Sequence, residues 1–196
     1  MPSIPERRPS DQTRNSANRR APPIIPSLGA LLILSPLVAQ VVYEEFLWSA
    51  MDFVVWTLLV GSAICLLMLG TRSQKTIDRL AVVVSVMTGF LTIWANLAVG
   101  IIGREDNPMN LLYFGILAVG IVGAVISRGR SEGLAITLGI MSALHFALAL
   151  WLYHLSVTSA ALTTGVVGAL WCLAAFLFRR ASQGDRRRTD KVTEDL

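Results

Sequence analysis

The sequence predicts an all-α, polytopic membrane protein: a bundle of six transmembrane helices with both termini in the cytoplasm. The chain has 196 residues, of which 54% are apolar and only 15% charged, whereas soluble domains have about 25% charged residues. The apolar residues gather in blocks near the roughly 20 residues that a helix needs to cross a bilayer. These blocks are 27–43, 50–69, 77–102, 108–127, 132–153 and 157–178.

The basic residues indicate how these segments alternate across the membrane. Of the 17 Lys and Arg residues, five precede the first segment, three lie in 70–79, two in 128–131 and six after 178, and only Arg104 falls on the other side. Cytoplasmic loops carry such an excess, so both termini are predicted inside. Aromatic residues support the same orientation because they gather near the predicted outer interface; they are Tyr43, Trp48, Tyr113, Trp151 and Tyr153.

Residues 1–26 are predicted to form a disordered, basic, proline-rich cytoplasmic arm, because they contain too few large apolar side chains to offset the entropy of ordering. Residues 24–40 have an alternative interpretation as a signal peptide, whose cleavage would leave five helices. Leu37-Val38-Ala39 lacks the small first residue of a cleavage site. An uncleaved first helix is therefore favoured.

The second and third segments carry local signals of their own. Ser49 and Asp52 match a capping box that opens the second helix. The third segment, 77–102, is long and is expected to tilt or extend past the interface. Its polar residues fall at spacings of three and four and so form one face, expected to turn toward the bundle and hydrogen-bond across helices; they are Ser85, Thr88, Thr92 and Asn96.

The loop before the fourth helix has two interpretations. Asn107 suits an N-cap and Pro108 the first helical position, which makes the loop a helix start. Alternatively, its acids and amides form an outer-loop site that holds a hard cation or guards a pore entrance. That candidate site comprises Glu105, Asp106, Asn107 and Asn110.

The fifth helix contains a histidine that is predicted to lie in a buried polar pocket. His145 lies near its middle, with Ser142 three residues earlier on the same side. At 1.5 Å per residue, Asn96 and His145 are expected roughly 9 and 12 Å below their outer helix ends. Together with Thr92, these residues are predicted to form a polar pocket in the outer half of the bundle.

Small residues recur every four positions on the last two helices, at Gly139, Ala143 and Ala147 and at Ala161, Gly165 and Ala169. Such faces let helices approach closely, and packing within the chain is favoured here over dimerisation. Residues 179–196 are predicted to form a charged, solvated cytoplasmic tail.

The sequence disfavours several classes of function. The apolar segments contain no charged residue near their middle, which disfavours ion-coupled transport. The two cysteines, Cys65 and Cys172, are expected to be buried and inert. The sequence shows no catalytic triad, zinc-protease or phosphate-loop pattern, and a second intramembrane His for haem ligation is lacking. We expect no catalytic residues, no cofactor, no metal and no nucleic-acid partner.

The run from Trp94 to Leu111 resembles the pattern W-x-N-x-A-V-G-I-I-G-x-E-D-N-P-x-N-L of a family of small inner-membrane proteins of Gram-negative bacteria. The resemblance is close over 94–111 and loose over 50–178. It implies a multi-pass protein of the bacterial inner membrane and leaves the chemistry open.

The sequence thus predicts a non-enzymatic membrane component that acts through helix packing faces and an acidic outer loop. Its expected partners are the lipid bilayer and a membrane protein or a second copy of the chain. The alternative is a channel or facilitator for a cation or small solute, entered past Glu105 and Asp106.

Overall fold

The structure is a computed structural model that describes residues 24–43, 48–73 and 75–194, so most of the arm predicted at 1–26 lies outside the described residues. Within these ranges the regular structure is entirely helical. The helices are α2 (Ile24–Val42), α3 (Ala50–Gly70), α4 (Thr76–Ala98), the 3₁₀ turn η1 (Pro108–Asn110) with α5 (Leu111–Ser127), α6 (Ser131–His154) and α7 (Thr158–Glu194). The prediction of an all-helical fold is confirmed, and the apolar helices fit a multi-pass membrane protein.

Five of these helices are long and apolar enough to cross a membrane, namely α3, α4, η1 with α5, α6, and α7 as far as Gly184. The apolar part of α2, Pro26–Val42, is shorter. At 1.5 Å per residue it covers about 25 Å, slightly less than the roughly 30 Å of hydrocarbon in a typical bilayer.

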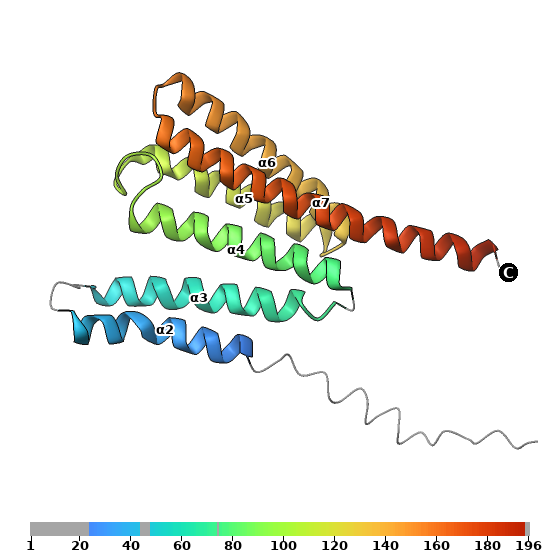
Figure 1. Ribbon diagram of the computed structural model, residues 1–196, viewed down its shortest axis with the longest axis horizontal. Coiled ribbons are helices and arrows are strands. Elements are labelled where there is room, and N and C mark those ends of the chain that lie inside the picture. Colours follow the sequence, from blue (N-terminus) through green and yellow to red (C-terminus); the bar gives the residue numbers. More distant parts are fainter. Residues whose placement is uncertain (1–23, 44–47, 74, 195–196) are drawn as a thin grey trace, which may run out of the picture.

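The helices divide into a four-helix core and a hairpin beside it. In Figure 1, α2 and α3 run side by side, α4 lies next to α3, and α5, α7 and α6 follow beyond it. The main buried cluster takes its side chains from α4 to α7 and the loop before η1, including Tyr113, Met141 and Trp171. The interior of the protein is therefore the space enclosed by the last four helices.

Glycines allow α5 and α6 to pack closely. A Cβ built on Gly123 would lie 2.3 Å from Cγ2 of Thr137, and one on Gly133 would lie 2.4 Å from Cβ of Ser127. Real Cβ atoms do not approach other atoms so closely, so these positions require glycine at the present helix separation.

The observed helix ends differ from the predicted segments by more than three residues in two places. Helix α4 ends at Ala98 rather than 102, because Gly100 adopts a positive φ of 71° and a Cβ there would meet the backbone of Arg104 at 2.4 Å. Helix α7 continues to Glu194, so the charged segment after 178 begins as a helical extension of the last span. The capping box at Ser49 and Asp52 is confirmed, with both reciprocal hydrogen bonds present.

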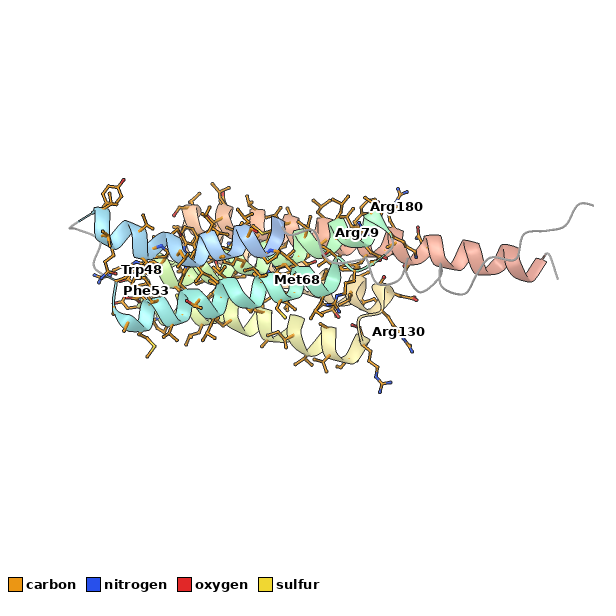
Figure 2. All side chains as sticks on the ribbon, turned by 90° about the horizontal axis from the view of Figure 1, so that it is seen from below. Trp48, Phe53, Met68, Arg79, Arg130 and Arg180 are labelled. Atoms are coloured by element: carbon orange, nitrogen blue, oxygen red, sulfur yellow. The ribbon has the colours of Figure 1, made fainter. Side chains whose placement is uncertain are left out.

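Charged residues mark the two ends of the bundle differently. Figure 2 shows Arg79, Arg130 and Arg180 at one end, whereas Trp48 and Phe53 lie at the other. This is the arrangement expected if the loops 71–75 and 128–130 and the end of the last span share one side of a membrane.

Candidate functional site

The polar residues of α4 form a buried stripe, as their spacing predicts. Thr88, Thr92 and Asn96 are each no more than 3% exposed. Their hydrogen bonds nevertheless stay within the helix, because Thr92 Oγ1 donates to Thr88 O at 2.7 Å and Asn96 Nδ2 donates to Thr92 O at 2.8 Å. The expected bonds from this face to other helices are not seen among the described residues. A hydroxyl or amide N–H that donates to the preceding turn needs no acceptor on a partner helix.

His145 is enclosed completely in the four-helix core, with no exposed surface. Its Nδ1 lies 2.8 Å from the carbonyl oxygen of Met141 in the preceding turn. Ser142, one turn away on the same helix, donates across to Gly168 O of α7 at 2.8 Å. Because a Cβ on Gly168 would lie 3.1 Å from Cβ of His145, this glycine lets α7 pass close to the imidazole.

Two aromatic residues flank the imidazole. The ring centroids of Tyr113 and His145 lie 6.1 Å apart, and those of His145 and Trp171 lie 6.5 Å apart. Tyr113 is fully buried, so its ring packs inside the bundle instead of facing the membrane surface as an interfacial aromatic residue would. It lies in the core because its hydroxyl is hydrogen-bonded to Oγ1 of Thr164 on α7.

The direction of that bond follows from its neighbours. Thr164 Oγ1 donates its single proton to Ala160 O at 2.6 Å. The bond between the two hydroxyls must therefore be donated by Tyr113. These hydrogen bonds connect α5 to α7. The sequence did not indicate this contact, because Tyr113 and Thr164 are 51 residues apart.

Trp171 is the other core residue that the sequence did not assign to the pocket. Its indole is 4% exposed and packs beside Gly89 of α4 as well as His145. Three buried side-chain atoms lack a hydrogen-bond partner within the described residues, and they are Asn96 Oδ1, His145 Nε2 and Trp171 Nε1. Such atoms are uncommon in folded proteins and call for a physical explanation.

The four residues of the predicted pocket are all buried, but the structure gives no direct bond between Asn96 and His145. The depths of Asn96 and His145 below their helix ends also differ from those expected. Since α4 ends at Ala98, Asn96 lies about 3 Å below that end, whereas His145 lies about 14 Å below the end of α6 at His154. The residues that flank His145 are Tyr113 and Trp171, and a shared site with Asn96 stays a hypothesis.

The outer loop is held by two of its four candidate residues. Asn107 Oδ1 accepts from Met109 N–H at 3.0 Å, and Asn110 Oδ1 accepts from Ile102 N–H at 2.9 Å. Asn110 also donates to Arg104 O at 2.8 Å and is 4% exposed. The N-cap predicted at Asn107 is confirmed, although the turn that it opens is 3₁₀.

The acidic pair of this loop remains on the surface. Glu105 and Asp106 are exposed, and Asp106 lies 3.6 Å from Arg104 in an exposed ion pair. Exposed pairs of this kind contribute little stability. The two asparagines thus bind the loop backbone while the two acids face outward, and the four do not converge on one point.

The small-residue face of α6 points away from the core. Ala143 and Ala147 are exposed, and a Cβ built on Gly139 would meet no atom within 4 Å. The matching series on α7 is split, because Ala161 is buried whereas Ala169 is exposed. Packing within the chain, favoured from sequence, therefore does not account for the face on α6.

Two of the depressions on the described surface are well defined, and neither is lined by the buried polar residues. One, of about 470 Å³, is lined by Arg128, Arg130 and neighbouring residues where α5 turns into α6. The other, of about 350 Å³, runs along α5 beside Gly115 and Leu144. Cys65 and Cys172 were expected to be buried, but both are exposed on the apolar surface.

The part of the chain that the structure describes contains no group of three or more His, Cys, Asp or Glu side chains arranged to hold a metal ion. Comparisons with known protein families, curated proteins and solved structures find no match to this chain. The packing surfaces and the buried polar groups are therefore the features of this chain that bear on its function.

Proposed function

We propose that the protein is a non-enzymatic membrane component that binds a partner helix through the outward face of α6. The observation that carries this proposal is the open space over Gly139, on the face where Ala143 and Ala147 are exposed. The partner helix belongs to a second copy of the chain or to another membrane protein.

The energetics of glycine support this choice. A glycine within a helix costs about 1 kcal/mol relative to alanine. Gly123 and Gly133 have a reason for this cost, because their neighbours leave no room for a Cβ. Gly139 has none within the described chain, and neither have Gly61, Gly115 and Gly165. Gly139 differs from these because the alanines that follow it at four-residue spacing, Ala143 and Ala147, are both exposed. Small-xxx-small faces bring helices together in membranes, where close backbone approach replaces the hydrophobic effect as the driving force.

The packed centre also supports a partner role over a conducting one. Tyr113, Met141, His145 and Leu152 are at most 1% exposed and lie in the region enclosed by the four helices. At the proposed pore entrance, the amide oxygens of Asn107 and Asn110 already accept hydrogen bonds from the loop backbone.

The proposed placement has six spans, cytoplasmic termini and a bacterial inner membrane. The position of Arg79, Arg130 and Arg180 at one end of the bundle supports this orientation. The likeness of residues 94–111 to the inner-membrane family supports the location. The shorter α2 would cross with some local thinning of the bilayer.

Cysteine labelling tests the placement. In a background in which Cys65 and Cys172 are replaced by serine, a cysteine at Glu105 should react with an impermeant reagent added outside intact cells, and one at Lys75 only after the membrane is opened. The opposite result at either position would exclude the proposed orientation.

Photo-crosslinking in native membranes tests the partner face. A crosslinker at Ala143 should give a discrete adduct, and one at Leu58, an exposed position of α3, should not. The adduct mass distinguishes a second copy from another protein. Gly139→Ile in the same chain should abolish the adduct, whereas Gly61→Ile, at an equally open glycine of α3, should preserve it. Equal crosslinking from Ala143 and Leu58, or an adduct that survives Gly139→Ile, would refute the proposal.

A further inference from the structure

The core of the bundle contains two unpartnered polar atoms on neighbouring rings. His145 Nε2 and Trp171 Nε1 each lack a hydrogen-bond partner within the described residues, although the side chains are only 0% and 4% exposed. Their ring centroids are 6.5 Å apart and the ring planes are inclined by 38°. His145 lies about 14 Å from the end of α6 and Trp171 about 20 Å from the start of α7, so both rings lie well away from these helix ends.

The hydrogen bond at the other imidazole nitrogen defines what Nε2 can do. Nδ1 lies 2.8 Å from Met141 O, and a carbonyl oxygen only accepts, so Nδ1 carries the proton. The buried polar residues of the described chain include no carboxylate. A buried charge without a counter-charge is costly, which favours the neutral ring. Nε2 then presents a lone pair and can only accept.

The indole has the complementary requirement, because its N–H can only donate. One buried acceptor and one buried donor therefore lie on adjacent rings without being bonded to each other. Leaving a buried polar group unpaired costs about 1–3 kcal/mol. A single hydroxyl group can satisfy both atoms, since it accepts from the indole and donates to the imidazole.

Among the described residues, the other buried hydroxyl groups near this core already donate to backbone carbonyl oxygens, namely those of Thr88, Thr92 and Ser142. The Tyr113 hydroxyl donates to Thr164, whose own proton goes to Ala160 O. The residue of α4 beside the indole is Gly89, which has no polar side chain to offer. A Cβ built on Gly89 would lie 3.7 Å from the ring. Asn96 is seven residues farther along, or about 10 Å. Among the described residues, neither His145 Nε2 nor Trp171 Nε1 has a partner, and a guest would complete the pair.

We propose that the α4–α7 core binds one hydroxyl-bearing guest between His145 Nε2 and Trp171 Nε1, and that water is its ordinary occupant. A buried water with two to four polar partners is a regular part of protein structure. The same chemistry would admit the hydroxyl of a small organic molecule. This site does not depend on the partner face of α6.

Nuclear magnetic resonance of the full chain in lipid bilayers, with ¹⁵N-labelled tryptophan and histidine, tests the site. The Trp171 indole proton should receive magnetisation from water, and the Nε2 signal of His145 should have the shift of a hydrogen-bonded acceptor. Trp56 provides a matched control, because its Nε1–H donates directly to Leu32 O at 2.9 Å and should show no such transfer. Trp171→Phe identifies the signal; if that variant fails to fold, phenylalanine replacements of the other four tryptophans identify it by elimination.

Three outcomes of this experiment distinguish a bound water, an organic occupant and the absence of a guest. Transfer from water to Trp171 but not to Trp56 supports a bound water. Hydrogen-bonded shifts without water transfer, together with a stoichiometric hydroxyl compound extracted from the purified protein, support an organic occupant. A free-acceptor shift at His145 with no transfer to Trp171 overturns the proposal.

Discussion

Replacing Gly123 by alanine should separate α5 from α6. The added Cβ would lie 2.3 Å from Cγ2, 2.4 Å from Oγ1 and 2.9 Å from Cβ of Thr137. Rotation of the threonine cannot relieve the third contact, because Cβ lies on the rotation axis. Carbon atoms prefer separations of about 3.5–4.0 Å, so the helices must move apart by more than half an ångström. Overpacking of this kind costs about 1–3 kcal/mol.

The same change at Gly139 is the control, because a Cβ there meets no atom within 4 Å. Both variants exchange glycine for alanine inside a helix and gain about 1 kcal/mol of helix propensity. That gain cancels in the comparison, and the difference between the two variants isolates the steric cost. Gly123→Ala should therefore unfold about 1–3 kcal/mol more readily than Gly139→Ala.

Reversible unfolding in mixed detergent micelles, followed by far-ultraviolet circular dichroism, measures the difference. Equal stability of the two variants would refute the close approach of α5 and α6. Gly120→Ala should be milder than Gly123→Ala, since its nearest atoms, at 2.5 and 2.9 Å, belong to the end of the flexible Met141 side chain.

Four further predictions concern the polar contacts. Asn110→Leu should destabilise the fold by about 1–3 kcal/mol by leaving the Ile102 N–H unpaired, whereas Asp106→Asn, in an exposed ion pair, should change stability by less than about 1 kcal/mol; equal losses would contradict the loop structure. A double-mutant cycle of Tyr113→Phe and Thr164→Val should give a coupling of about 0.6 kcal/mol, and no coupling would exclude the bond between α5 and α7. If Asn96 and His145 share one pocket, Asn96→Ala and His145→Ala should couple beyond about 0.5 kcal/mol, whereas additive losses would reject the shared pocket. Liposome cation flux should be unaffected by Glu105→Ala and Asp106→Ala if the partner function holds, and a clear loss of flux in both would favour the channel.

The sequence predicts the helices well because their cause is local. A membrane leaves the backbone no partner other than itself, so each apolar block of suitable length becomes a helix. The early end of α4 has a local cause too, which apolar patterning conceals. Val99, Ile101 and Ile102 read as a continuation of the span, and only the positive φ of Gly100 shows that the chain turns away there.

The polar core is harder to predict because its neighbours come from different helices. Tyr113 stands close to a predicted interface in sequence, yet its hydroxyl finds Thr164 on α7 and the ring is buried. Trp171 has apolar neighbours in sequence, and only the contact of α7 with α4 and α6 brings it beside Gly89 and His145. By contrast, the burial of Thr92 and His145 followed from helical spacing alone.

The small residues of α6 show that sequence spacing and the three-dimensional structure must be considered together. Their spacing reveals a face suited to close helix contact, but spacing is the same whether that face meets a helix of this chain or of another protein. The direction in which it points decides between these cases. Helix α6 lies at the far side of the core from the α2–α3 hairpin (Figure 1), and its face at Gly139 is open. Because the hairpin packs beside α4 and cannot reach that face, a helix that covers Gly139 must come from outside the described part of the chain.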